Sequence, residues 1–498
     1  MKAVVITDAR SSQARALIPY LSGLGYQVQV PPDGCRLWKE ADVRAFAAAC
    51  PRPLAGVIHP APPFFRCSLE EADEALVGKA RDEGPLAAWC VARVFCDMLR
   101  EQGGGSLIFL NSIHAEKPMG YGFLFSAGCG AVQMLNREIS QDAGTGGVRT
   151  FFIQRGPMEG DPDMKSDISH FYYGTDLRYP LRSIPAADQL NDLVAFLLTP
   201  AASPLAGSDL RADGGMTMYY GERRKDSLPA PPRKFAEYEM PDKPHAEAEQ
   251  RVALVTGSGK GVGAGIVRVL CAAGMKCVVH CNSNRALAQK TLEQIQAAGG
   301  EAFLCQADVS DPAQAQRLVD ETVNRYGRLD ILVNNAALQM NLFVDEYREE
   351  TLRHLWDVNF AGYWRMIRAA LPCLRKSPAP RIINIGSVHG KRPTCFDAGY
   401  AMTKGGIKML TREAAIELQA DGIPVNCLSL GGVRIEFKTG DPDFHNRRPR
   451  ETLNMNLRNR DRLVLPEEVG STVLYLCSEP AAALTGDCIR IDCGQMLK

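Results

Sequence analysis

Two side chains four residues apart have the types and spacing needed for acid–base chemistry. Tyr400 and Lys404 occur in the stretch YAMTKGGIKML (400–410), which we predict to be helical. On a helix, residues four apart project from the same face. A free phenol has a pKa of about 10, and a neighbouring ammonium favours the phenolate and lowers that value. The pair therefore predicts a general acid/base, Tyr400, tuned by Lys404.

A glycine-rich turn, TGSGKGVG (256–263), follows the apolar run VALV and precedes a helical pattern. Glycines let the backbone turn sharply and approach a pyrophosphate, which would lie against the positive helix N-terminus. A glycine-rich turn alone is weak evidence, but its position after a strand favours dinucleotide binding. The residues that we expect to contact the dinucleotide here are Gly257, Ser258, Lys260, Gly261, Val262 and Gly263.

The order of motifs in the second half resembles that of the short-chain dehydrogenase/reductase family. The turn TGxxxGxG is followed by Asn-Asn-Ala (334–336), by Ser387 and by the Tyr-x-x-x-Lys pair. The resemblance covers essentially all of residues 251–498 and, as a degraded copy, the first half. It implies an oxidoreductase that transfers hydride between a nicotinamide dinucleotide and a carbonyl or alcohol.

The resemblance implies a catalytic set of Asn359, Ser387, Tyr400 and Lys404. Ser387 ends a predicted strand and can hydrogen-bond the substrate oxygen, where charge develops during hydride transfer. Asn359 corresponds to the helix asparagine with which the family holds a water and passes protons outward. Lys404 would also hold the nicotinamide ribose. A lone serine at a strand end is usually a cap and a lone helix asparagine is usually solvated, so these roles rest on the complete set.

The resemblance also implies further cofactor contacts and shows departures from the family pattern. Leu430 stands where a proline is usual, and Ile435 replaces a threonine that meets the carboxamide, for which Thr439 could substitute. Besides the turn, the expected cofactor-binding residues are Ser283, Arg285, Asp308, Val309, Asn335, Tyr400, Lys404 and Gly431.

The end of the second strand bears on the choice between NADP(H) and NAD(H). NAD-binding proteins place an acidic residue there to accept hydrogen bonds from the ribose. This chain reads VVHCNSNR (278–285), with no acid, with Ser283 and Arg285 available and with Lys260 nearby. An uncharged or basic pocket tolerates a 2′-phosphate, so we favour NADP(H), although Arg285 could simply begin a solvated helix.

A proline-rich segment divides the chain. Residues 221–250 hold five prolines and no periodic apolar face, which is typical of a linker, and they separate residues 1–220 from 251–498.

The sequences of the two halves can be aligned on each other. Ser112 aligns with Ser387 at an offset of 275 residues, and Phe125 aligns with Tyr400 at the same offset. Because Thr7 aligns with Thr256 at an offset of only 249 residues, the first copy is about 26 residues shorter than the second. We interpret this pattern as a tandem duplication, since two unrelated domains would not keep an offset constant.

Short apolar runs alternate with helical patterns in both halves. In the second half these runs include VALVTG, CVVHC, DILVNN and RIINIGS. Alternation of this kind predicts a parallel sheet with helices on both faces. We therefore expect an α/β protein with two Rossmann-like, doubly wound domains in tandem, the first abbreviated by loss of its third strand.

The first half lacks the glycine-rich turn and most of the side chains of the predicted catalytic set. Its turn position reads TDARSSQA (7–14), without glycine and with an aspartate that would repel a phosphate. Gly84 stands for Asn359, Phe125 for Tyr400 and Cys129 for Lys404, whereas Ser112 remains. Its apolar helical stripe persists. We interpret the first half as a pseudo-enzyme retained as a built-in subunit partner.

Composition excludes several classes of protein. Lysines plus arginines equal acidic residues, 57 against 57, so no global field attracts nucleic acid or a membrane surface. No CxxC pair occurs among the 16 cysteines, which we expect to be reduced in a cytoplasmic protein, and we expect no metal. No apolar run approaches membrane-spanning length, and the N-terminus is typical of a strand rather than a signal peptide.

Two function classes remain open. The first is an NADP(H)-dependent oxidoreductase for a small carbonyl or alcohol substrate, with chemistry confined to residues 251–498. The alternative is a non-enzymatic NADP-binding scaffold or sensor. The arginine-rich segment at 432–465 could bind an anionic or polyhydroxylated substrate, or be a solvated lid. If each chain mimics a dimer, a homodimer would give the four-domain arrangement common in the family.

Overall fold

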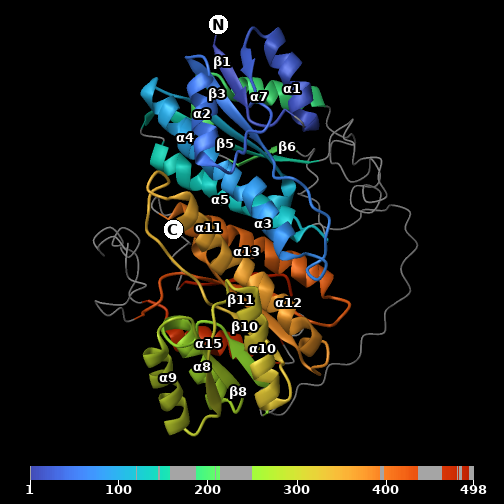
Figure 1. Cartoon of the computed structure of the whole chain (residues 1–498), viewed down its shortest axis with the longest axis vertical. Helices are drawn as coiled ribbons and strands as arrows, with labels where there is room; N and C mark the ends of the chain where they lie inside the picture. Colours follow the sequence, from blue (N-terminus) through green and yellow to red (C-terminus); the bar gives the residue numbers. More distant parts are fainter. Residues whose placement is uncertain are drawn as a thin grey trace, which may run out of the picture.

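The structure is a computed structural model of the 498-residue chain. It describes residues 2–9, 11–118, 121–143, 146–156, 187–207, 209–212, 250–392, 397–435, 463–478, 481 and 485–492. The expected linker, apart from its last residue, and the arginines at 447–462 lie outside these residues. The two halves occupy opposite ends of the long axis, and a layer of helices lies between their sheets (Figure 1).

The described part of the first half forms a six-stranded parallel sheet in the order β2-β1-β3-β4-β5-β6. Strands β3 and β4 are buried almost continuously, because helices cover both faces of the sheet. The strands are β1 (Ala3–Ile6), β2 (Gln27–Gln29), β3 (Leu54–Pro60), β4 (Gly105–Ser112), β5 (Val148–Arg155) and β6 (Asp209–Ala212).

The second half forms, within the described residues, a seven-stranded parallel sheet in the order β13-β12-β11-β10-β7-β8-β9. Its third strand, β9, has no counterpart in the first sheet, which confirms the predicted abbreviation. The strands are β7 (Val252–Val255), β8 (Lys276–Cys281), β9 (Ala302–Gln306), β10 (Ile331–Asn334), β11 (Arg381–Ser387), β12 (Val425–Leu430) and β13 (Cys488–Ile491). Both sheets are doubly wound, as predicted.

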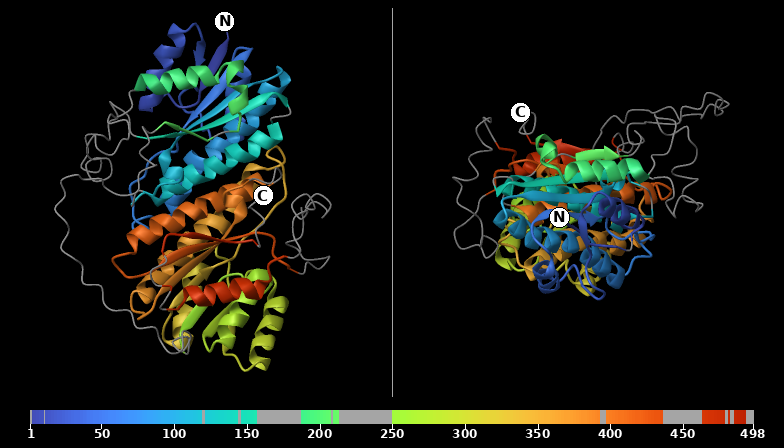
Figure 2. Two further views of the ribbon diagram at one scale, coloured as in Figure 1. Left: turned by 180° about the vertical axis from the view of Figure 1, so that it is seen from behind. Right: turned by 90° about the horizontal axis from the view of Figure 1, so that it is seen from above.

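Helices cover both faces of each sheet (Figures 1 and 2). None of the helices in the described residues is both long and apolar enough to span a bilayer. Helices of the first half are α1 (Ser12–Gly23), α2 (Glu40–Ala49), α3 (Glu74–Arg81), α4 (Ala87–Glu101), α5 (Phe123–Ala143) and α7 (Ala187–Leu197). Those of the second are α8 (Gly261–Ala272), α9 (Arg285–Ala297), α10 (Pro312–Tyr326), α11 (Glu349–Trp356), α12 (Gly362–Leu374), α13 (Ala398–Glu417) and α15 (Pro466–Leu476).

One hydrophobic core runs through both halves. It contains residues of α4 and α5 together with residues of α12 and α13, whereas the outer face of each sheet has a separate core. At the junction the ring of Phe123 stacks on that of Trp364, with centroids 6.4 Å apart. The Trp364 indole also donates a hydrogen bond to the carbonyl of Leu69 at 3.0 Å. The inner faces of the two sheets therefore share a single core.

The helices α5 and α13 lie side by side in the middle of the molecule (Figure 2). A Cβ atom at Gly405 would lie 2.5 Å from the carbonyl oxygen of Gly130, and one at Gly130 would lie 2.9 Å from that of Gly405. These glycines correspond at the offset of 275, so equivalent positions of the two halves meet each other. Such closeness requires residues without side chains on both helices.

Reciprocal polar contacts surround this crossing. Arg137 donates to the carbonyl of Lys391 at 2.5 Å, and its equivalent Arg412 donates to the carbonyl of Glu116, the equivalent of Lys391. Each half therefore makes the same contact to the other, as expected for a pseudo-two-fold axis between α5 and α13.

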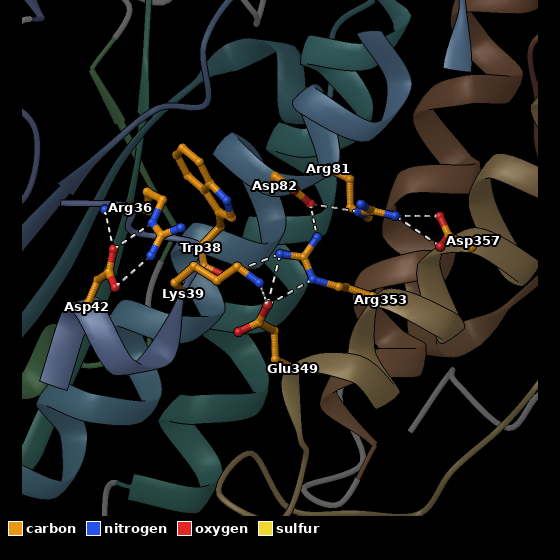
Figure 3. A network of polar contacts seen from close by, with 9 residues as sticks. All are labelled: Arg36, Trp38, Lys39, Asp42, Arg81, Asp82, Glu349, Arg353 and Asp357. Carbon is orange, nitrogen blue, oxygen red and sulfur yellow. Dashed lines mark hydrogen bonds and ion pairs between the residues drawn. The ribbon is translucent and has the colours of Figure 1, made fainter. Parts of the chain in front are cut away.

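Charged side chains bridge the halves at one edge of the junction (Figure 3). Arg81 pairs with Asp357 at 2.8 Å, and Arg353 pairs with Asp82, the first-half equivalent of Asp357. Lys39 pairs with Glu349 at 2.7 Å, and Glu349 also accepts from Arg353 at 3.0 Å. These are contacts between partly buried groups, which are screened less by salt than exposed pairs.

We predict that Gly405→Ala destabilises the protein. The added methyl would enter the backbone of α5, and overpacking of this kind costs about 1–3 kcal/mol, more than the gain of up to about 1 kcal/mol from replacing a helical glycine. The midpoint of urea unfolding should therefore fall. Gly78→Ala is the matched control, because a Cβ there would meet only an arginine nitrogen at 3.9 Å. If Gly405→Ala raised the midpoint as the control should, the close helix contact would not exist in solution.

Candidate functional site

The candidate site lies at the carboxyl edge of the second sheet. Strands β7 and β10 are neighbours there, and the strand order reverses between them. The glycine-rich turn follows β7, and Asn335 follows β10. Ligands of open α/β sheets bind in the crevice at such a reversal point.

The glycine-rich turn has the backbone that its sequence requires. Gly257 and Gly261 have φ of +65° and +57°, in the region that only glycine adopts easily. A Cβ at Gly263 would lie 2.6 Å from the carbonyl oxygen of Gly257. Helix α8 begins at Gly261, and no side-chain hydrogen bond from the preceding Lys260 caps it. The amides of its first turn can therefore bind an anion.

His280, which the sequence analysis missed, braces the turn. The Gly257 amide donates to His280 Nδ1 at 2.8 Å, so the proton is on Nε2, which donates to the carbonyl of Ala307 at 2.9 Å. Burial lowers the pKa of His280 to about 4, so the ring is neutral at pH 7. The sequence feature that could have indicated this role is the presence of a histidine within the apolar run CVVHC (277–281).

Two predicted cofactor residues support the turn from inside the protein. The buried Ser258 hydroxyl donates to the carbonyl of Val255 at 2.7 Å and accepts from the His280 amide at 2.8 Å. Asn335 donates through Nδ2 to the carbonyls of Thr256 and Gly257, at 2.9 and 3.2 Å. The side chains of Ser258 and Asn335 therefore fix the backbone conformation of the turn.

The end expected to receive the adenosine has exposed polar groups. Ser283 and Arg285 are both exposed, on either side of Asn284, which caps α9. The Asp308 carboxylate accepts from the amide and the hydroxyl of Ser310, at 2.8 and 2.7 Å, so it stabilises its own turn. Val309, the next residue, is buried.

Helix α13 brings Tyr400 and Lys404 toward the end of β11. Lys404 Nζ donates to the carbonyl of Ile385 at 2.8 Å and lies 5.2 Å from the centre of the Tyr400 ring. Burial lowers the pKa of Lys404 to about 8, so it is still mainly protonated at pH 7. Ser387 ends β11, and its Oγ accepts from the amide of His389 at 3.2 Å. The structure thus brings three of the four predicted catalytic residues to one region.

Asn359, the fourth, lies in a π-turn (Asp357–Ala361) between α11 and α12. Its Oδ1 accepts from the Leu338 amide at 2.7 Å. Its Nδ2 donates to the Leu338 carbonyl at 2.9 Å and to the Thr403 hydroxyl at 3.1 Å. Thr403 lies between Tyr400 and Lys404 in the chain, so Asn359 ties the π-turn to the helix that carries both.

The departures from the family pattern lie beside the turn. Gly431, after β12, donates its amide to the carbonyl of Ile491 at 2.9 Å. Leu430 is buried in the core of the outer face. The Ile435 side chain lies against the turn, since a Cβ at Gly261 would be 3.5 Å from it. Thr439 lies outside the described residues.

The equivalent edge of the first half has a helix start that a side chain caps. Helix α1 is capped by Ser11, whose hydroxyl accepts from the Ala14 amide at 3.2 Å. At the equivalent of Asn334, His59 forms a hydrogen bond of 2.7 Å with Thr7. Burial lowers the pKa of His59 to about 4. One amide of the first turn of α1 thus donates to a capping side chain, whereas the residue before α8 makes no such hydrogen bond.

Of the four catalytic positions, Ser112 keeps the serine in the first half, and the other three lack the functional side chain. Phe125 packs against Phe64 and His114, with ring centroids 5.5 and 5.9 Å apart. Burial raises the pKa of the Cys129 thiol well above its ordinary value, so it carries no charge. Gly84 occupies a π-turn, Asp82–Leu86, at the position equivalent to that of Asn359. The backbone feature persists without its functional side chain.

Comparisons with known proteins find a match in each half of the chain. The family described as short chain dehydrogenase matches residues 251–443, and that described as Enoyl-(Acyl carrier protein) reductase matches residues 54–217. A dehydrogenase/reductase of known structure from Sinorhizobium meliloti 1021 matches with a TM-score of 0.46 and 27% identity, over 50% of this chain and 96% of that protein.

Two relatives match along nearly their whole length. A 3-oxoacyl-[acyl-carrier-protein] reductase of Synechocystis sp. is 31% identical over 252 residues, which are 50% of this chain and 97% of that protein. Glucose 1-dehydrogenase 2 of Bacillus subtilis is 32% identical over 249 residues, 50% of this chain and 95% of that protein. On this similarity, the chain belongs to the short-chain dehydrogenase/reductase family, as an NAD(P)-dependent oxidoreductase with two regions of this kind in tandem.

Proposed function

We propose that residues 251–498 transfer hydride between NADP(H) and a small carbonyl or alcohol substrate, while residues 1–220 have a structural role. One observation carries this proposal. Tyr400, Lys404 and Ser387 gather at a sheet edge where α8 is uncapped, whereas the equivalent edge of the first half has Phe125 and a capped helix. Within the described residues, the edge of the second half is therefore the one that combines a candidate anion site with an acid/base.

The residues present fit a dinucleotide. The first turn of α8, which its N-cap side chain does not cap, would receive the pyrophosphate. Gly263 lets the turn pack closely, since a Cβ there would lie 2.6 Å from the Gly257 carbonyl oxygen. Lys404 would hold the nicotinamide ribose. The exposed Ser283 and Arg285 would receive a 2′-phosphate, and Arg285 could do so with two parallel hydrogen bonds. We therefore favour NADP(H) over NAD(H).

In the proposed mechanism, the bound dinucleotide supplies or accepts the hydride. Tyr400 donates its proton to the substrate oxygen during reduction and accepts it during oxidation. The Lys404 ammonium, fixed by the Ile385 carbonyl, stabilises the phenolate. The Ser387 oxygen accepts from the His389 amide, so its proton is free to bind the negative charge on the substrate oxygen. Asn359 positions the loop at Leu338 against α13.

The names of the relatives support this class of substrate. One is a reductase of 3-oxoacyl groups and the other a dehydrogenase of glucose. Both substrates present a carbon–oxygen bond at which hydride transfer exchanges a carbonyl with an alcohol. The family membership favours an enzyme over the alternative of a non-enzymatic scaffold.

We also propose a homodimer that contacts through α7 and α15. These helices have equal length, and Phe196 and Tyr475 occupy equivalent positions on them. Both aromatic side chains are exposed, to 43% and 48%. The faces of α5 and α13 are already covered within one chain, so α7 and α15 remain available for a second copy.

Tyr400→Phe should lower kcat by about 10²–10⁴-fold, the usual contribution of a general acid/base. Affinity for NADPH should change little, because the phenol ring remains. Wild type is first screened on ketones, keto acids and sugars by nicotinamide absorbance, and the variant is then measured on the active substrate. Tyr326→Phe, on the distant α10, is the control and should keep full turnover. Undiminished turnover in Tyr400→Phe would refute the proposed acid/base.

Calorimetric titration with NADPH should show one site per chain, because α1 is capped and lacks the glycine turn. NADH should bind more weakly, since it cannot use Arg285, and Arg285→Ala should reduce the difference. Two sites per chain would overturn the structural role of the first half. Equal binding of both dinucleotides would overturn the cofactor preference.

Light scattering after gel filtration should give twice the chain mass. The double variant Phe196→Glu/Tyr475→Glu should give the mass of a single chain, because four carboxylates would face each other across the contact. The matched variant Leu24→Glu changes an exposed leucine at the end of α1 and should remain dimeric. A monomeric wild type, or a dimer that survives the double variant, would contradict this contact.

A further inference from the structure

Two cysteines face each other across the last two strands of the second sheet. Cys427 on β12 and Cys488 on β13 are directly paired in register, and each thiol shifts the pKa of the other. Neighbouring strands lie about 4.7–4.9 Å apart, within the range of about 4.4–6.8 Å that a disulfide needs between Cα atoms. Cys427 is buried, whereas Cys488 is half-buried. The pair is therefore spaced for a bond, with one thiol closer to solvent.

Cationic side chains from α13 act on the outer thiol. The hydrogen bond from Cys427 lowers the pKa of Cys488, and Arg412 and Lys408 lower it further. Burial and the neighbouring Asp487 oppose this effect. The pKa of Cys427 is raised, mainly by its hydrogen bond with Cys488. Cys488 is also the less buried thiol of the pair, so it is the one that an oxidant in solvent can reach first.

The first half has a carboxylate at the equivalent place. In its sheet, Asp209 on β6 pairs in register with Phe152, the equivalent of Cys427. Arg137, the equivalent of Arg412, forms an ion pair with Asp209. Gln133, the equivalent of Lys408, donates to the same carboxylate at 3.1 Å. The fold thus holds an anion at this position in one half, which supports a thiolate at the same position in the other.

We propose that Cys488 and Cys427 form a peroxide-reactive dithiol, in which Cys488 attacks the oxidant and Cys427 closes a disulfide between β13 and β12. The Cys488 thiolate attacks one oxygen of a hydroperoxide, the S–O bond forms, the O–O bond breaks, and hydroxide or alkoxide leaves. The Cys427 thiol then attacks the sulfenic sulfur, the S–S bond forms, and water leaves. Two thiols are oxidised and one hydroperoxide is reduced.

The dithiol lies close to β11, the strand that ends at the proposed catalytic Ser387. A Cβ at Gly386, the residue before Ser387, would be 2.5 Å from the Cys427 sulfur. Neither thiol belongs to the proposed acid/base set, and the reaction of the dithiol with peroxide involves no hydride, although the charge of Lys404 acts on Cys427. Its test can therefore use thiol chemistry alone.

The test treats the reduced full-length protein with equimolar hydrogen peroxide and maps the products by mass spectrometry. Wild type should lose two hydrogens and yield a cross-link between the peptides of Cys427 and Cys488. Cys427→Ser cannot close the bond and should instead carry a dimedone adduct, the mark of a sulfenic acid, on Cys488. Absence of the cross-link in wild type, or of the adduct in Cys427→Ser, would overturn the proposal.

Lys408→Gln tests the electrostatic part, because it installs the residue that the first half has at this position. It should slow sulfenic acid formation by about threefold or more. Cys373, a half-buried thiol on α12 with a raised pKa, is the control, and Cys373→Ser should not change the cross-link. Cys271 and Cys277, which are both buried, with a raised pKa at Cys277, should stay reduced. An unchanged rate in Lys408→Gln, or equally fast oxidation of Cys271 and Cys277, would refute the assigned role of the cations.

Discussion

The backbone contact between Gly130 and Gly405 is the constraint on which the rest of this structure depends. It allows α5 and α13 to approach so closely that the inner faces of two sheets share one core. Because the two glycines are equivalent in the repeat, the contact also defines a pseudo-two-fold axis. The chain thereby buries within itself a surface that each half alone would expose to water.

The same packing sets the electrostatics of α13. Burial lowers the pKa of both Lys404 and Lys408 to about 8. Lys404 faces Tyr400 and the end of β11, whereas Lys408 acts on Cys488 of β13. These lysines are four residues apart on one helix, and each acts electrostatically on a different side chain, Tyr400 or Cys488. In our proposal, the first half contributes to the chemistry of the second by covering this helix.

The two halves share packing groups but differ at the chemical positions. Trp89 and Trp364 are equivalent and fully buried, and an arginine guanidinium lies over each ring, at 5.6 and 5.5 Å. The π-turn also persists at Asp82–Leu86. By contrast, Phe125 replaces the phenol, and Ser11 caps the helix that would meet a phosphate. This division is what we expect if residues 1–220 serve as an internal subunit.

The sequence by itself determined the fold class, the two regions and the residues at the chemical positions. The offset of 275, shared by Ser112/Ser387 and Phe125/Tyr400, predicted two similar regions, and its change to 249 at Thr7 predicted the missing strand. Such features are local in the chain, because a glycine turn or a Tyr-x-x-x-Lys spacing acts through backbone geometry alone. They are therefore readable without knowledge of what packs against them.

Only the tertiary structure decided what each side chain contacts. In the folded protein the Ser258 hydroxyl donates to a buried carbonyl, and Asn359 forms hydrogen bonds with Leu338 and Thr403. His280 accepts a hydrogen bond from the amide of Gly257 in the glycine turn. It also paired Cys427 with Cys488 and Gly130 with Gly405, residues far apart in the chain. Strand register and helix crossing arise from the collective packing of the core, and no short stretch of sequence contains that information.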